Sequence, residues 1–218
     1  MATRFYLPNG SSAAVTVSST TGWDSTGGKI TPDQACSKDK LGTALTTDSL
    51  VSLSSNNQKV LSRQFVSKPI AAQTVTGTIK AYIMGKQSNA KGKVFRALMR
   101  AIVVSNDGST VRGTLLAADQ YAVDSEWPTG SPTVRCFADG DTVSDVTASA
   151  GDRIVFQFGF TDDGSGNTSK CSAALRFGDD NASDLPESVD DATDANPWVE
   201  LSMDVVFQNE TRTRFING

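Results

Sequence analysis

The sequence contains no histidine and only three cysteines in its 218 residues. The absence of histidine excludes Ser-His-Asp and Cys-His catalysis, histidine-based zinc sites and the commonest general base. Cys36, Cys136 and Cys171 are odd in number and far apart, which argues against a disulfide framework and against a zinc or iron–sulfur site. We therefore expect reduced thiols in a protein that folds in a reducing cytosol.

Long apolar runs and clusters of basic residues are also missing. No stretch approaches the length of a membrane span, and residues 1–8 lack the apolar core of a secretion signal. The net charge is −4, which argues against binding to a nucleic-acid backbone. Neither a phosphate-binding glycine loop nor a dinucleotide fingerprint occurs. The sequence therefore predicts no nucleic-acid partner, no membrane partner and no organic cofactor.

The strongest positive signal is the period-two alternation of β-strands. In residues 153–160, the side chains of Ile154, Phe156, Phe158 and Phe160 fall on one face. Such a face is typical of a strand that buries one side in a core. Further strands are expected at residues 4–7, 13–17, 50–53, 59–66, 74–84, 94–104, 111–117, 133–137, 171–177 and 199–207.

Turn signals separate these strands. The sequence NDGS at 106–109 predicts a tight hairpin, because Asp and Gly tolerate the backbone angles that such turns require. Residues 22–48 and 178–196 have no strand period, and we place both on the surface as long loops. About ten strands at this spacing predict an all-β fold, an antiparallel β-sandwich with jelly-roll-like topology, in which residues 1–218 form one domain.

The acidic residues are unevenly distributed. Residues 161–194 hold nine acids against two bases, and such charges repel in a compact loop unless a cation or a basic neighbour offsets them. The loop DDGSGN at 162–167 offers oxygen ligands of the kind that calcium takes, so Asp162, Asp163 and Asn167 are candidate calcium ligands. Their spacing departs from that of an EF-hand loop, and a solvated hairpin turn is the competing interpretation.

Aromatic and paired carboxylate residues give two further candidates. Trp127 stands in a loop-like stretch and is the candidate for an exposed ring that stacks on a sugar, with core packing as the alternative. A glycosidase would need two carboxylates, for which Asp152, Glu200 and Asp204 are available. We expect Asp152 to bond turn amides and the other two to face solvent from a strand, so the sequence predicts no enzyme.

Several segments together resemble a group of structural proteins encoded in tailed-bacteriophage genomes. The resemblance spans nearly the whole chain, but its motifs are strand and turn elements and carry no catalytic residues. The segments are TRFYLP at 3–8, GWDST at 22–26, RQFVSKPI at 63–70, VSNDGSTVRGT at 104–114, GDRIVF at 151–156, DLP at 184–186 and NPWVELS at 196–202.

This resemblance implies a component of the virion, made in the host cytoplasm, without assigning its place in the particle. We expect a non-enzymatic structural protein that decorates the capsid exterior and binds the major capsid protein. The alternatives are a protein associated with the tail fibre or baseplate, bound to tail proteins, and a carbohydrate-binding adhesin module that takes a glycan. By analogy with decoration proteins we expect a homo-oligomer, such as a trimer.

Both ends of the chain are candidate interaction arms. Residues 1–19 form the first arm and residues 209–218 the second. In the second, Arg212 and Arg214 alternate with threonines and are candidate contacts to an acidic partner. A frayed, solvated terminus is the competing interpretation.

Overall fold

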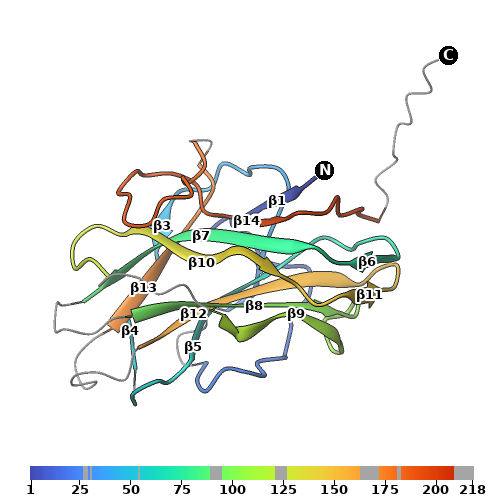
Figure 1. Cartoon of the computed structure of the whole chain (residues 1–218), viewed down its shortest axis with the longest axis horizontal. Helices are drawn as coiled ribbons and strands as arrows, with labels where there is room; N and C mark the ends of the chain where they lie inside the picture. Colours follow the sequence, from blue (N-terminus) through green and yellow to red (C-terminus); the bar gives the residue numbers. More distant parts are fainter. Residues whose placement is uncertain are drawn as a thin grey trace.

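Two β-sheets stack face to face across a core of phenylalanine and aliphatic side chains (Figure 1). The computed structural model describes residues 1–26, 29, 31–53, 55–88, 95–120, 127–162, 172–180 and 183–208. The strands in these ranges are β1 (Thr3–Tyr6), β2 (Gln34–Ala35), β3 (Thr46–Thr47), β4 (Val51–Ser52), β5 (Val60–Val66), β6 (Gln73–Val75), β7 (Thr78–Gln87), β8 (Phe95–Val104), β9 (Val111–Gln120), β10 (Thr133–Thr142), β11 (Val146–Ala148), β12 (Arg153–Asp162), β13 (Ser172–Phe177) and β14 (Trp198–Leu201).

One sheet has five strands in the order β2-β5-β12-β8-β9. Its pairs are antiparallel, except that β2 runs parallel to β5. The central strand β12 is buried on both faces, and Phe156 lies between Phe65 of β5 and Ala101 of β8. The predicted apolar face of β12 is confirmed, because all four of its aromatic and aliphatic side chains join the main core.

The other sheet has seven strands, organised around β7. Its path is β1-β14-β7-β13-β3, with β10 also paired to β7 and β4 to β13. The first half of β7 pairs with β14 and the second half with β13. Strands β6 and β11 form a separate two-stranded sheet. The all-β sandwich that the sequence predicts is confirmed, whereas the jelly-roll topology stays a prediction.

Aromatic contacts join the two layers. The ring of Phe5 in β1 lies 5.1 Å from that of Phe156 in β12, centroid to centroid. The rings of Phe137 in β10 and Phe158 in β12 lie 5.5 Å apart in an edge-to-face arrangement. Such pairs add to the free energy that burial of the rings supplies. The core therefore draws on the first strand of the chain as well as on its middle.

The predicted hairpin at 106–109 is confirmed, since it joins β8 and β9 as an antiparallel pair. The predicted strand at 74–84 is divided into β6 and β7 at Gly77, whose φ of 99° suits glycine best. The predicted strand at 13–17 is wrong, because the amide of Val17 donates to the carboxylate of Asp33 instead of to a strand. The segment at 199–207 keeps its alternating burial but leaves the ladder after Leu201.

The two regions without a strand period are not simple surface loops. Residues 22–48 include β2 and β3 and bury Trp23 and Asp33 against the five-stranded sheet, and residues 178–196 bury Leu185 against the other sheet. Among the residues that the structure describes, no helix is long and apolar enough to cross a membrane.

The expected arms differ in what the structure describes. Residues 3–6 of the first arm are β1, a strand of the chain's own sheet, and Phe5 and Leu7 are fully buried. These residues are therefore engaged within the chain. The second arm, with Arg212 and Arg214, lies outside the described residues.

Candidate functional site: an acidic strap on a basic sheet face

The candidate calcium ligands are described only in part. Asp162 ends β12 and is 2% exposed, and its Oδ1 accepts a hydrogen bond from the backbone amide of Asn57 at 2.5 Å. Asp163 and Asn167 lie outside the described residues, so the calcium site stays a prediction. Within the described ranges, no three acidic or cysteine side chains gather closely enough to hold a metal ion.

Trp127 is a core residue, and the prediction that it is exposed is wrong. Its side chain is 1% exposed and packs against the rings of Phe95 and Phe160. Gly85 of β7 provides the space, because a Cβ at that position would lie 2.9 Å from the indole ring. The guanidinium of Arg135 lies 5.8 Å from the indole centroid. A sugar has no access to this ring.

Two of the three carboxylates considered for hydrolysis have structural roles. Asp152 accepts a hydrogen bond from the amide of Ser149 at 2.8 Å, which confirms its predicted place in a turn. Glu200 pairs with Arg4 at 2.9 Å on the outer face of the seven-stranded sheet. Asp204 is exposed. Asp152 is therefore engaged in a turn and Glu200 in an ion pair.

The acidic segment at residues 183–196, here called the strap, lies on the outer face of the seven-stranded sheet (Figure 1, orange, between β13 and β14). It holds five carboxylates and neither lysine nor arginine. Four of the carboxylates pair with cations: Asp184 with Arg4 at 2.8 Å and Lys40 at 2.9 Å, Glu187 with Lys80 at 2.6 Å, Asp190 with Arg135 at 2.7 Å, and Asp194 with Arg176 at 2.9 Å.

The five cations come from five places in the chain. They belong to β1, the segment after β2, β7, β10 and β13. Sequence reasoning left open whether a cation or a basic neighbour offsets the acidic charge, and the fold supplies basic neighbours for the strap. The fifth carboxylate, on Asp191, accepts a hydrogen bond from the amide of Thr193 at 2.6 Å.

An apolar cluster lies beneath the strap. The indole NH of Trp198 donates to the carbonyl of Leu185 at 2.9 Å, and the ring of Tyr82 lies 5.2 Å from that of Trp198. The strap also extends the edge of β10, because the amide of Val134 donates to Asp191 and its carbonyl accepts from Asp190. The buried members of the cluster are Tyr82, Met84, Val134, Cys136, Leu185, Ala195 and Trp198.

Arg4 is the centre of the charged layer. Its guanidinium lies 3.9 Å from the ring centroid of Trp198 and forms ion pairs with Asp184 and Glu200. Burial alone would raise the pKa of Asp184, but hydrogen bonds from Lys40 and Arg4 outweigh it and the pKa is lowered. One carboxylate is thus bound by two cations, one of which lies over an aromatic ring. Such an arrangement can recognise an acidic segment of polypeptide.

A hollow in the surface lies near the five-stranded sheet, beside Cys36. It has a volume of about 220 Å³ and exists because most of its lining side chains are small. Burial raises the pKa of the Cys36 thiol, so this thiol is a poor nucleophile. Its lining residues are Ser11, Ser12, Ala14, Ala35, Cys36, Ser37, Leu41, Val66, Ser67, Lys68 and Arg153.

Sequence reasoning found the acidic half of the strap site and missed the basic half. The acids are consecutive enough to be visible as a run, whereas the five cations are scattered between residues 4 and 176. No local pattern marks a lysine or arginine that will face a strap, because strand pairing alone brings these positions together.

Comparison with protein families finds no matching family, and comparison with curated proteins finds no matching protein. Among solved structures, an α-amino acid ester hydrolase labelled with selenomethionine shares 8% identity, with a TM-score of 0.37 over 92% of this chain and 36% of that chain. A structure of infectious bursal disease virus, Gt strain, shares 14% identity, with a TM-score of 0.27 over 72% of this chain and 35% of that chain. This chain spans about a third of either neighbour, and at these scores neither bears on function.

Proposed function

We propose that this chain is a non-enzymatic structural protein of a tailed-bacteriophage particle, and that it decorates the capsid exterior. The observation that carries the proposal is how the sandwich is enclosed. Residues 11–26 lie over the five-stranded sheet and the strap over the seven-stranded sheet, so the chain covers the outer faces of both sheets with its own segments. Charged side chains of the strap and of the strands beneath it pair with one another.

A decoration protein acts by contact, and an enclosed sandwich suits that task. Its partners are the major capsid protein and further copies of itself, with a trimer as the expected assembly. Synthesis in the reducing host cytoplasm agrees with the buried side chains of Cys36 and Cys136, which form no disulfide. The sequence resemblance to phage structural proteins supports a place in the virion. The enclosed fold supports a structural role there.

The test is the composition and image of the particle. We expect purified particles to contain the chain in a fixed ratio to the major capsid protein, measured by quantitative mass spectrometry. Cryo-electron microscopy of particles from a deletion strain, before and after adding the purified chain, locates it. Density restored on the capsid surface supports decoration. Absence of the chain from purified particles overturns the particle role, and density restored on the tail overturns decoration in favour of a tail-associated protein.

A further inference from the structure

The strap is held by ion pairs, by a few backbone hydrogen bonds and by few buried side chains. Its buried side chains are Leu185, Ala195 and Asn196, and most of the residues between them are exposed. Val189 is 39% exposed, although it is apolar. The carboxylates of Asp190 and Asp194 have exposed fractions of 52% and 61%. The pairs Glu187–Lys80 and Asp194–Arg176 are partly solvated on both sides, and such pairs contribute about 0.2–1 kcal/mol each and are screened by salt. The Asp190–Arg135 pair differs, because the side chain of Arg135 is fully buried.

The sandwich beneath is held differently. Its two layers meet in a large cluster of buried apolar side chains. Burial of apolar surface holds these layers together and does not depend on charge pairing. Regions with few buried apolar contacts open locally at a lower free energy than the core. The strap and the sandwich therefore differ in what opens them, because salt weakens the attachment of the strap and leaves the core contacts intact.

The surface under the strap has a defined chemistry. Without the strap, the cations Arg4, Lys80 and Arg176 would stand without Asp184, Glu187 and Asp194. The ring of Trp198 and the backbone edge at Val134 would be uncovered with them. Three cations, an aromatic ring and an open strand edge together fit an extended acidic segment, through charge pairing and strand addition.

We propose that the strap is a detachable cover, which opens while the sandwich stays folded and uncovers a docking face for an extended acidic segment of another protein. The strap is then the resident occupant of this face, and a partner segment of the same chemistry replaces it. The proposal does not depend on the particle role, and each can fail without the other.

Two cysteines can report separately on the opening of the strap and on the integrity of the sandwich core. Cys136 is 4% exposed and lies in the cluster beneath the strap, whereas Cys36 is 2% exposed and lies in the main core. Two single-cysteine variants, each with Cys171→Ser and either Cys36→Ser or Cys136→Ser, isolate the two thiols. The rate of labelling by uncharged N-ethylmaleimide is measured at constant pH against sodium chloride concentration.

We expect labelling of Cys136 to accelerate by roughly tenfold or more between low salt and about 1 M salt, where the screening length falls to about 3 Å. Labelling of Cys36 stays constant, and circular dichroism shows a folded sandwich throughout. The double variant Glu187→Gln, Asp194→Asn, which removes two exposed strap carboxylates, reproduces the acceleration at low salt. Equal salt dependence for both thiols, or a Cys136 rate that follows global unfolding, overturns the detachable cover.

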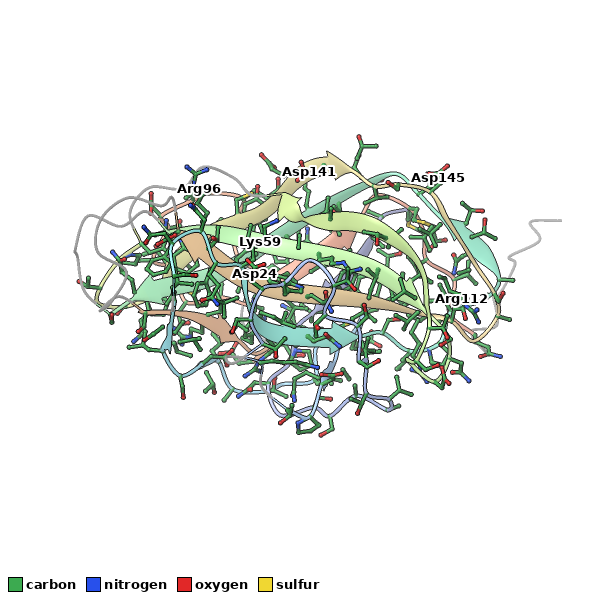
Figure 2. The ribbon with its side chains drawn as sticks, turned by 90° about the horizontal axis from the view of Figure 1, so that it is seen from below. Asp24, Lys59, Arg96, Arg112, Asp141 and Asp145 are labelled. Carbon is green, nitrogen blue, oxygen red and sulfur yellow. The ribbon has the colours of Figure 1, made fainter. Side chains whose placement is uncertain are left out.

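A matched control removes two carboxylates elsewhere. Asp24→Asn and Asp141→Asn change the net charge by the same amount at positions that carry no strap contact, and Figure 2 labels both. This control is expected to label at the wild-type rate. Acceleration in the control equal to that in the strap variant would mean that net charge, and not the strap, governs access to Cys136.

The docking face is tested with a peptide of known chemistry. A fluorescent peptide with the sequence of residues 183–196 is titrated against the Glu187→Gln, Asp194→Asn variant and followed by anisotropy. We expect it to bind this variant at least about tenfold more tightly than wild type, which is a difference of about 1.4 kcal/mol. A peptide with every Asp and Glu replaced by Asn and Gln is expected not to bind. Equal binding of both peptides, or no binding of either, overturns the acidic docking face.

Discussion

At the scale of single residues, small side chains decide where large ones lie. Gly85 gives the indole of Trp127 a place in the core. Gly159 of β12 has a similar role, since a Cβ there would lie 2.6 Å from the ring of Trp23 and 1.9 Å from the carbonyl oxygen of Val60. Each pairing joins residues far apart in sequence, and each converts a tryptophan in an irregular segment into a packed one.

The burial of Trp127 predicts a loss of stability on truncation. We expect Trp127→Ala to lower the free energy of unfolding by about 3–5 kcal/mol, because it leaves a cavity beside Phe95 and Phe160. Urea unfolding followed by circular dichroism measures it. The control Trp127→Phe keeps an apolar ring and is expected to lose less. A loss below about 1 kcal/mol for Trp127→Ala would contradict a core role for this side chain.

A buried ion pair gives the second feature at this scale. Arg63 and Asp48 pair with side chains that are 4% and 3% exposed. Burial raises the pKa of Asp48 to about 6, and the attraction of Arg63 only partly opposes it. Burial likewise lowers the pKa of Arg63. Both shifts have the same cause, which is the cost of removing a charge from water.

This shift predicts a pH dependence with a definite sign. The folded state holds the proton on Asp48 more tightly than the unfolded chain, so stability falls as pH rises from about 4 to about 6 and the penalty is complete above that range. We expect wild type to lose about 2–3 kcal/mol relative to Asp48→Asn between pH 4 and pH 7. Urea unfolding of both proteins across this range measures the difference. A difference that is flat or rises with pH would refute the assignment.

At the scale of elements, the five-stranded sheet is joined to its cover by a buried polar network. Figure 2 shows the segment that includes Asp24 lying over this sheet. Gln157 of β12 is the centre, because its carbonyl accepts from the indole of Trp23 at 2.9 Å and its amide donates to Ser19 at 2.6 Å and to Gln64 at 2.7 Å. The network fixes where residues 11–26 lie, since an unpaired buried polar group is costly.

The network predicts that Gln157→Leu loosens the cover as well as the sheet. The substitution leaves the Trp23 indole and the Gln64 carbonyl without their partner, and we expect a loss of about 2 kcal/mol or more in stability. Amide hydrogen exchange at Val17 is expected to accelerate more than exchange in β8. The substitution Gln208→Leu, at an exposed position, serves as the control. Equal acceleration at both places would show that the cover and the sheet open together.

At the scale of the whole molecule, the strap and Asp179, two acidic parts of the described chain, meet basic or amide-rich surfaces. The strap meets five cations, and Asp179, just before it, is fully buried and accepts amide hydrogen bonds from Leu41 and Thr43 at 2.6 and 2.8 Å. This arrangement offsets a local excess of negative charge with cations and amides of the chain itself.

This charge pairing predicts that calcium does not change the thermal stability of the protein. We expect the midpoint of thermal unfolding to be the same with a chelator and with millimolar calcium, because the strap carboxylates already pair with cations. Scanning calorimetry measures it. A ligand that binds only the folded state raises the midpoint, so a rise with calcium would contradict this prediction and favour the site expected at Asp162, Asp163 and Asn167. Loss of that rise in Asp162→Asn would assign it.

Alternation and turn chemistry alone determined the sandwich. The faces of β12 and β8, the hairpin at 106–109 and the turn role of Asp152 could all be predicted, because they depend on neighbours within a few residues. Short strands such as β2 and β3 could not, since a two-residue strand carries no period and exists only where a partner strand lies alongside.

The tertiary structure alone decided which charges meet and which tryptophans are hidden. Absence of histidine and an acidic run were visible in the sequence, and so was the question of what offsets that run. The answer required Arg4, Lys80 and Arg176 to be brought to one face by the pairing of β1, β7 and β13 with their neighbours. Such contacts depend on sheet order and on the space that glycines leave, and neither is encoded by a local pattern.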